Sequence, residues 1–285
     1  MSVTEPAIDL DGAIVRCHVT GDGPTVVFVH GVWVAGPLWD VVVERLDGMR
    51  RIVPTWPLGA HADPAPAADL SARATARRIP ELLEALDLRD VTLVGNDTGG
   101  GLCLAALGTG HPGLQRIGRL VLTNCDSYEH FPPKGFDTMV SLMRRSPATG
   151  SALLRFFASG PGRSVFLKGV CATRPPTGER ARAIFGAFAD SPATRKDALR
   201  FTQSLEPSVT LDAVDDLRSF SRPVLLAWGA ADKLFPLDHA RRLRADFPDA
   251  RLEVIDGAST FVMLDQPDEL AARISTFVHD TMSNA

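Results

Sequence analysis

The stretch "GNDTGG" places a single carboxylate, Asp97, between glycines, after a β-rich run and before a helix-forming run. A reactive side chain on a tight strand-to-helix turn needs small neighbours, because its own backbone is strained and the helix passes close by. The string G-x-D-x-G alone is weak evidence for a nucleophile, but its position between a strand and a helix makes that evidence stronger. Asp is also a favoured helix N-cap, so a purely structural Asp97 is the competing interpretation.

Three other segments carry polar groups at the ends of apolar runs. "VVFVHGVW" puts His30 and Gly31 directly after a predicted strand, and "LLAWGAAD" presents Asp232 just beyond another. "DGASTFVMLDQPDEL" follows the last predicted strand. In an open α/β sheet, ligands bind outside the carboxyl ends of the strands. We therefore expect these segments to meet Asp97 at one edge of a sheet.

The elements that must position these residues are strands alternating with helices. Several of the strand candidates are continuous apolar runs, as expected where both faces of a parallel strand are covered. The predicted strands are 13–19, 25–30, 50–55, 91–95, 119–124, 223–229 and 251–256, and the predicted helices are 37–47, 71–86, 98–108, 237–246 and 267–282. This alternation predicts an α/β fold with a mostly parallel twisted sheet flanked by helices.

The alternation stops between about residues 126 and 207, where we find no convincing strand and several Pro and Gly interruptions. So long a stretch is too much for an ordinary connection. We interpret residues 128–207 as a helical insertion over the carboxyl edge of the sheet, with the core formed by 1–127 and 208–285. Its apolar residues are expected first to form its own small core, and the remainder could line a pocket.

Composition excludes several classes of protein. Thirty basic and thirty-four acidic residues give a net charge of −4, which gives no indication of a basic face that would bind nucleic acid or anionic lipid. No apolar run is long enough to span a membrane, and the N-terminus does not resemble a signal peptide. The four cysteines lack metal-ligand spacing and are expected to be reduced thiols in a cytoplasmic protein. The sequence leaves the oligomeric state open, with a homodimer as one alternative.

With these motifs in place, the sequence resembles the α/β-hydrolase superfamily, and within it the epoxide hydrolases and haloalkane dehalogenases, which carry Asp as nucleophile. The resemblance extends from about residue 13 to 280, and the insertion matches their cap domain only in position and helical character. It implies an α/β-hydrolase fold, a hydrophobic small-molecule substrate, and no cofactor or metal ion. The pocket residues expected from it are Trp33, Phe131, Thr260 and Phe261.

The resemblance assigns a role to each matching position. Asp97 would be the nucleophile, and the backbone N–H groups of Val32 and Thr98 would form an oxyanion hole. Asp232 would be the acid that orients a catalytic histidine. His30, in the HG pair, is expected to shape its loop rather than to act as a base.

The family pattern fails at one position. The catalytic histidine normally follows the last strand in a string like G-x-G-H-F, and here the string is "GASTF", with Thr260 at the histidine position. An ester formed on Asp97 would need a His-activated water for its hydrolysis. Thr260 has no basic site near neutral pH and cannot take that proton. Asp232 then has a structural role, or pairs with a cation such as Lys233.

Two further departures narrow the chemistry. Thr98 stands where the dehalogenases have a Trp halide ligand, and "HGVW" replaces their H-G-N-P, so dehalogenation is disfavoured. Epoxide hydrolases activate the ring oxygen with cap tyrosines, and Tyr128 is the single tyrosine of this chain. Tyr128 is therefore predicted as an acid donor, with a packing role at the domain junction as the alternative.

Another histidine could replace the missing base. His130 lies two residues beyond Tyr128, where the insertion begins above the strand-to-helix turn at Asp97, and we rank it first. We refer to this turn as the elbow. His61, in the loop "PLGAHADP", ranks second. The same segment as His130 holds Asp126 and Glu129, beside the position where some dehalogenases keep their acid. A surface position for Asp126, Glu129 and His130 is the competing interpretation.

Three functions follow. The first is an epoxide-hydrolase-like hydrolase in which Asp97 attacks a hydrophobic small molecule. The second is a lyase, isomerase or cyclase in which Asp97 acts as base or transient nucleophile, so that no water needs activation. The third is a catalytically silent protein that has kept a ligand-binding pocket.

Overall fold

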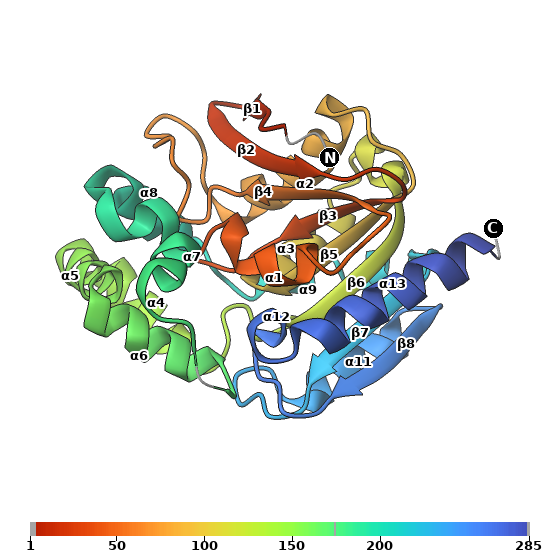
Figure 1. Cartoon of the computed structure of the whole chain (residues 1–285). Coiled ribbons are helices and arrows are strands. Elements are labelled where there is room, and N and C mark those ends of the chain that lie inside the picture. Colours follow the sequence, from red (N-terminus) through yellow and green to blue (C-terminus); the bar gives the residue numbers. More distant parts are fainter. Residues whose placement is uncertain (1–3, 174, 284–285) are drawn as a thin grey trace.

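An eight-stranded sheet forms the centre of the protein in a computed structural model that describes residues 4–173 and 175–283 (Figure 1). Strand order is β1-β2-β4-β3-β5-β6-β7-β8, and the strands from β4 onward are parallel, whereas β1, β2 and β4 pair antiparallel. The strands are β1 Ala7–Leu10, β2 Ala13–Thr20, β3 Thr25–Val29, β4 Arg50–Thr55, β5 Val91–Asp97, β6 Ile117–Cys125, β7 Val224–Gly229 and β8 Ala250–Ile255. The predicted α/β-hydrolase architecture is confirmed.

Helices cover both faces of this sheet. On one face α1 (Asp40–Val43) packs against α13 (Pro267–Ser283), and on the other α2 (Ala72–Ala85) packs against α3 (Thr98–Leu107). Helix α11 (Leu237–Asp246) packs on β7 and β8. The central strands β3, β5 and β7 consist almost entirely of buried residues, which explains their unbroken apolar runs.

Two elements differ from the sequence-based expectation. The helix expected at 37–47 is a short 3-10 turn, η1 (Gly36–Trp39), followed by the single-turn α1. Three consecutive valines at 41–43 favour helix poorly, and Gly48 then takes a φ of +71°. Strand β1 was not predicted, because its four residues, of which only Leu10 is buried, make no apolar run.

The segment between β6 and β7 is helical and lies beyond one end of the sheet (Figure 1). It comprises α4 (Phe136–Arg145), α5 (Pro147–Ala158), α6 (Gly160–Val170), α7 (Gly178–Asp190) and α8 (Pro192–Gln203), and returns through α9 (Ser208–Leu211) and α10 (Val214–Ser219). Ser146, Ser159 and Ser191 cap α5, α6 and α8, each with a proline at the first or second helical position. This pairing of a serine cap with an early proline is a strong helix-start signal. We refer to α4–α8 as the cap.

Candidate active site

Asp97 lies at the junction of β5 and α3 in a strained backbone conformation. Its φ is +53° and its ψ −135°, a region that non-glycine residues rarely occupy. The flanking glycines are required by contacts: a Cβ at Gly95 would lie 2.8 Å from the Gly100 Cα, and one at Gly99 would lie 2.4 Å from the His30 carbonyl oxygen. The G-x-D-x-G string is thus explained by backbone packing around a turn that projects the Asp97 side chain.

The loop after β3 meets the Asp97 carboxylate. A Cβ at Gly31 would lie 2.0 Å from Asp97 Oδ2, so only glycine fits there. The backbone N–H groups of Val32 and Thr98 donate hydrogen bonds to the Asp97 side chain. These are the two groups that the sequence assigned to an oxyanion hole, and they face the one carboxylate on the turn.

His30 holds this loop in place rather than reacting. Its Nδ1 donates to the carbonyl oxygen of Gly31 at 2.9 Å, and its Nε2 accepts from the backbone N–H of Trp56 at 2.9 Å. Burial lowers the pKa of His30 to about 4, so the ring is neutral near pH 7. Both ring nitrogens are therefore engaged in shaping the turn.

The environment of Asp97 shifts its acidity strongly. The residue is 8 % exposed, and burial raises the pKa of Asp97 to about 7. This value is the net result: the Asp232 charge adds to the effect of burial on the Asp97 pKa, while the N–H groups of Thr98 and Val32 oppose it. A carboxylate with this pKa exists in both protonation states at neutral pH.

Thr260 forms a hydrogen bond with Asp232, the residue that the family resemblance predicts as the partner of a catalytic histidine. Its Oγ1 donates to Asp232 Oδ2 at 3.0 Å, and the side chain is fully buried. The other Asp232 oxygen accepts the backbone N–H groups of Leu234 and Phe235 at 2.8 and 3.2 Å. Asp232 is thus occupied without any base, and its alternative pairing with Lys233 is not seen in the described residues.

Two asparagines that the sequence reasoning missed brace this arrangement. Asn96 Nδ2 donates to the Thr260 carbonyl oxygen at 2.7 Å, which ties the elbow to the loop after β8. Asn124 exchanges hydrogen bonds with the backbone of Gly229, its Oδ1 accepting at 2.6 Å and its Nδ2 donating at 3.1 Å. The sequence signal that could have identified them is an Asn at the carboxyl end of an apolar strand, which both β5 and β6 have.

Tyr128 lies outside this arrangement, so the prediction that it protonates a substrate oxygen is wrong for this structure. Its hydroxyl donates to Asp246 Oδ2 at 2.7 Å, and the Arg242 guanidinium lies over its ring at 3.6 Å. Both partners belong to α11. Tyr128 has a φ of +54°, a turn that directs its side chain to that helix. Its role is the packing alternative at the domain junction.

We expect Tyr128→Phe to leave the chemistry at Asp97 unchanged. The variant loses one hydrogen bond to a charged carboxylate, so the free energy of unfolding should fall by about 1–2 kcal/mol. Urea denaturation measures the free energy of unfolding, and the rate of turnover measures the chemistry at Asp97. A large loss of activity in a stably folded Tyr128→Phe protein would return Tyr128 to the site.

His130 is also not placed as a base. Its ring stacks on His239 with centroids 4.4 Å apart, and its Nε2 lies 3.7 Å from Glu129 Oε1. Glu129 in turn binds Arg242 on α11 at 2.7 Å. The surface interpretation of Glu129 and His130 fits this placement, and the displaced-base prediction does not.

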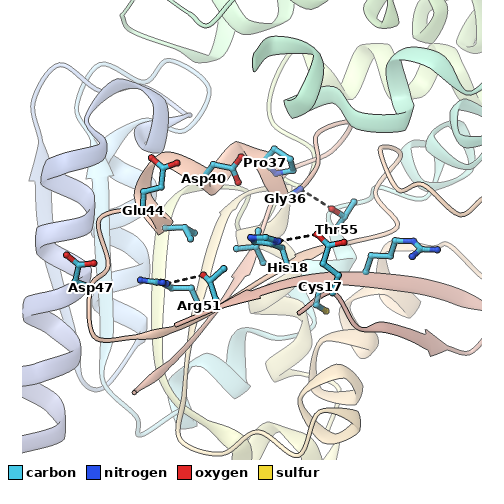
Figure 2. A pocket seen from close by; sticks show the side chains of 14 residues that line it. Cys17, His18, Gly36, Pro37, Asp40, Glu44, Asp47, Arg51 and Thr55 are labelled. Carbon is cyan, nitrogen blue, oxygen red and sulfur yellow. Dashed lines mark hydrogen bonds and ion pairs between the residues drawn. The ribbon is translucent and has the colours of Figure 1, made fainter. Parts of the chain in front are cut away.

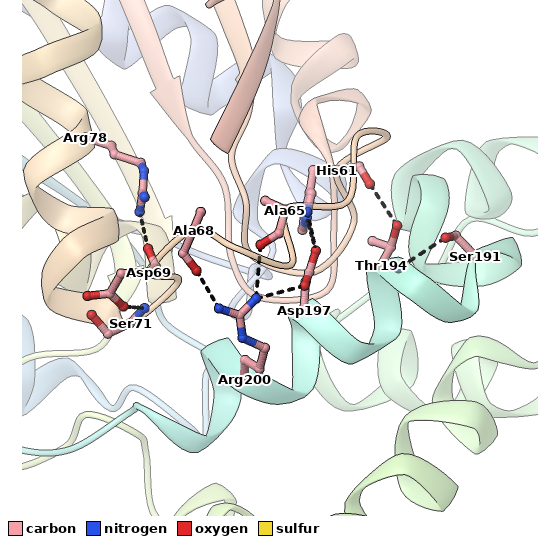
Figure 3. A network of polar contacts seen from close by, with 10 residues as sticks. All are labelled: His61, Ala65, Ala68, Asp69, Ser71, Arg78, Ser191, Thr194, Asp197 and Arg200. Atoms are coloured by element: carbon pink, nitrogen blue, oxygen red, sulfur yellow. Dashed lines mark hydrogen bonds and ion pairs between the residues drawn. The ribbon is translucent and has the colours of Figure 1, made fainter. Parts of the chain in front are cut away.

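His61 binds the cap instead of the elbow (Figure 3). Its Nε2 lies 3.2 Å from Asp197 Oδ2 on α8, and both side chains are buried. Arg200 of the same helix donates to Asp197 and to the carbonyl oxygens of Ala65 and Ala68 (Figure 3). This network fastens the loop after β4 to the cap.

The remaining histidines do not supply a base either. His18 lies in a surface groove of about 740 Å³ beside η1 and α1, where it pairs with Glu5 (Figure 2). Asp97, Asp232 and Thr260 do not line that groove. All seven histidines of the chain fall within residues 4–173 and 175–283, and in that part none hydrogen-bonds to Asp97 or Asp232.

Aromatic rings connect the loop after β3 with the cap. Trp33, at φ +63°, stacks on Phe188 with centroids 5.8 Å apart, and its Nε1 donates to Thr202 Oγ1 of α8. Phe166 of the cap contacts both Trp33 and Phe261. The predicted pocket residues Trp33 and Phe261 thus belong to one apolar cluster. Further rings around Trp33 and Phe166 are Phe136, Phe157 and Phe185.

Phe131 and Thr260, the other predicted pocket residues, are fully buried near the elbow. A Cβ at Gly101 in α3 would lie 2.8 Å from the Phe131 ring. Phe131 therefore packs on the first turn of α3, while Thr260 is fixed to Asp232.

Asp265 fastens the cap to the loop that carries Thr260. Its carboxylate accepts the backbone N–H groups of Ala172, Thr173 and Ser259 at 2.8–2.9 Å, and the Thr173 hydroxyl at 2.6 Å.

Asp265→Ala should lower the free energy of unfolding by about 2–3 kcal/mol, because these donors lose their acceptor. Chemical denaturation measures this loss. A change below about 0.5 kcal/mol would show that water replaces the carboxylate fully.

Comparison with known proteins shows the family of this chain. The alpha/beta hydrolase family profile matches residues 26–273, and the chain belongs to this family. A 2-hydroxy-6-oxononadienedioate/2-hydroxy-6-oxononatrienedioate hydrolase of Cupriavidus pinatubonensis is 26% identical, with 85% of this chain and 82% of that protein aligned. A non-heme chloroperoxidase of Kitasatospora aureofaciens is 28% identical, with 87% and 89% aligned.

Solved structures show the same fold. A haloalkane dehalogenase from Bradyrhizobium elkani superposes with a TM-score of 0.83 at 16% identity, covering all of both chains. An alpha/beta hydrolase fold protein from Burkholderia ambifaria gives 0.81 at 20% identity, covering 94% of this chain and 96% of its own. No helix in the described part of the chain is long and apolar enough to cross a membrane.

Proposed function

We propose that this protein is an α/β-hydrolase-fold enzyme that moves a proton in an apolar small molecule, with Asp97 as the base. The reaction class is isomerase, lyase or cyclase. The observation that carries this proposal is the hydrogen bond from Thr260 to Asp232, which fills the place of a catalytic histidine with a group that cannot activate water. Chemistry that needs no activated water is what this site can complete.

The state of Asp97 supports a role as base. A general base works best when its pKa lies near the operating pH, and burial brings the pKa of Asp97 to about 7. The N–H groups of Val32 and Thr98 fix the carboxylate in one orientation. An oriented carboxylate in an apolar site loses little of its basicity to hydration.

The rings around Trp33 and Phe261 support an apolar substrate. Trp33 lies in the loop after β3 and Phe261 in the loop after β8, and Phe166 of the cap contacts both. Aromatic and aliphatic linings with a few convergent polar groups are typical of small-molecule sites. We therefore favour a substrate with an aromatic or extended apolar part beside its acidic C–H group.

A second candidate is attack by Asp97 on an epoxide, in line with hydrolase relatives. The N–H groups of Val32 and Thr98 favour it, because they could hold the carbonyl oxygen of an Asp97 ester. With Tyr128 and His130 turned to α11, the site lacks the two groups that we expected to assist opening and hydrolysis.

Benzisoxazole tests the proposal without knowledge of the substrate. A base removes its single acidic C–H proton, the C–H electrons form a nitrile, the N–O bond breaks, and the oxygen leaves as an ortho-cyanophenolate. We expect the protein to accelerate this reaction far beyond an equal concentration of acetate. Binding of benzisoxazole without acceleration would instead support a catalytically silent ligand-binding protein.

A further inference from the structure

A second buried carboxyl group, Asp126, lies beside Asp97. Asp126 directly follows β6, and β6 pairs with β5 so that Cys125 is opposite Asp97. The backbone N–H of Asp126 donates to the carbonyl oxygen of Asp97 at 3.4 Å. The two carboxyl groups therefore project from neighbouring positions at the carboxyl edge of the sheet.

Asp126 is poorly satisfied for so buried a group. It is 1 % exposed, and its Oδ1 has no hydrogen-bond partner among the described residues. A Cβ at Gly101 would lie 2.8 Å from both the Asp126 Cβ and the Phe131 ring, so the side chain lies between α3 and an aromatic ring. The hydrogen-bonding neighbour of its carboxyl group is the Thr98 side chain. A lone carboxylate would be costly in such surroundings.

The two carboxyl groups differ in what stabilises a negative charge. Asp97 accepts two backbone N–H groups, whereas the Asp126 carboxyl group has, among the described residues, the Thr98 hydroxyl alone. Burial first, and then the charge of Asp97, raise the pKa of Asp126 well above its usual range. The thiols of Cys125 and Cys103 in this cluster are kept neutral by burial, which raises their pKa, and Asp232 acts on Asp97. Of the two carboxyl groups, Asp126 is therefore the one whose surroundings favour the protonated form more.

We propose that Asp126 stores the proton that this site donates, and that the Thr98 hydroxyl passes it to a substrate oxygen. This inference rests on the proposed function of Asp97 as base. It gives the site an acid and a base on adjacent strands, which suits a substrate whose acidic C–H group lies near a carbonyl, ether or leaving oxygen.

The proton transfers balance within the site. Asp97 takes the proton from the substrate carbon, while the Thr98 hydroxyl gives its proton to the substrate oxygen and receives the proton of Asp126. Asp97 then ends protonated and Asp126 ionised. Return of one proton from Asp97 to Asp126 restores the starting state, with no net gain or loss of protons by the protein.

Infrared difference spectroscopy tests the storage of the proton without any catalysis. The carbonyl stretch of a protonated carboxyl group is separate from that of a carboxylate. At pH 8 the spectrum of the wild type minus that of Asp126→Asn should show one protonated carboxyl, and Asp97→Asn should retain it. A carboxylate band in this difference would overturn the proposal, whatever the fate of Asp97 as base.

The transfer through Thr98 is tested with benzisoxazoles that differ in their leaving oxygen. Thr98→Val should slow the unsubstituted compound by roughly 10²-fold, because its phenolate is less stabilised than a nitro-substituted one and gains more from a proton. It should slow a nitro-substituted compound far less, and Thr98→Ser should restore the rate. Asp126→Asn should behave like Thr98→Val.

Equal slowing of both compounds by Thr98→Val would show that Thr98 only supports the fold, and would overturn the relay. Because the two Thr98 variants leave Asp126 in place, this comparison does not depend on the stability of Asp126→Asn. Should the wild type not open either compound, the proposed function fails, while the infrared result still decides where the proton lies.

Discussion

Replacing Asp97 with Asn should lower the rate of benzisoxazole opening by roughly 10²–10⁴-fold, the range that one general base contributes. Asn keeps the shape of the side chain and can still face the Val32 and Thr98 N–H groups through its oxygen, but it cannot take a proton. The strained turn at φ +53° tolerates Asn better than most residues. The protein should therefore fold while its chemistry is lost.

A matched control is available on the surface. Asp238→Asn removes one carboxylate that contacts Arg241 on the same helix and lies far from the elbow in sequence. It should retain the full rate. If Asp97→Asn and Asp238→Asn retained equal rates with both proteins folded, the reactive group would lie elsewhere.

Thr260→His should give the protein a hydrolytic step. The Thr260 Oγ1 lies 3.0 Å from Asp232 Oδ2, so an imidazole at this position would find its acid already in place. When a small aryl epoxide is supplied, any ester on Asp97 should persist in the wild type and be hydrolysed in the variant. Diol release should rise by about 10²-fold or more, the usual contribution of a general base.

Thr260→Gln is the control for this gain. Gln is of similar size to His and can bind Asp232, yet it has no basic nitrogen. Intact-protein mass spectrometry should find the ester in the wild type and in Thr260→Gln, but not in Thr260→His. Equal diol release by all three proteins would show that another group in the wild type activates water.

Much of the fold could be predicted because its signals are local. Apolar runs defined β2 to β8, and the glycines around Asp97 defined the turn between β5 and α3. Strand β1 was missed although Asp11 and Gly12, both at positive φ, form the two-residue hairpin turn that a D-G pair favours. Its signal was in the turn rather than in the strand.

The side-chain directions after β6 could not be predicted in the same way. Sequence position put Tyr128 and His130 above the elbow, but the positive φ of Tyr128 turns this segment toward Asp246 and Arg242 on α11. Asp126, two residues earlier, remains beside Asp97. Chain proximity gave the right segment and the wrong residue, because one backbone turn decides which side chain faces inward.

The hydrogen-bond partners of Thr260 could not be predicted from the motif either. The family pattern predicted a missing base, whereas the structure shows that the Thr260 hydroxyl binds Asp232 and that Asn96 holds the Thr260 carbonyl. These contacts join residues 28 and 164 positions apart in the chain. Long-range pairings of this kind leave no periodic signal in a single sequence.

The pH dependence of benzisoxazole opening tests most directly whether Asp97, with its raised pKa, is the base. Because the base must be ionised, the rate of the wild type should rise with pH, change about tenfold per unit on the acid side, and level off above a midpoint near the Asp97 pKa of about 7. In Asp97→Asn this titration should vanish. A wild-type rate that is flat from pH 5 to 9, or a profile that Asp97→Asn shares, would contradict the assignment of Asp97 as the base.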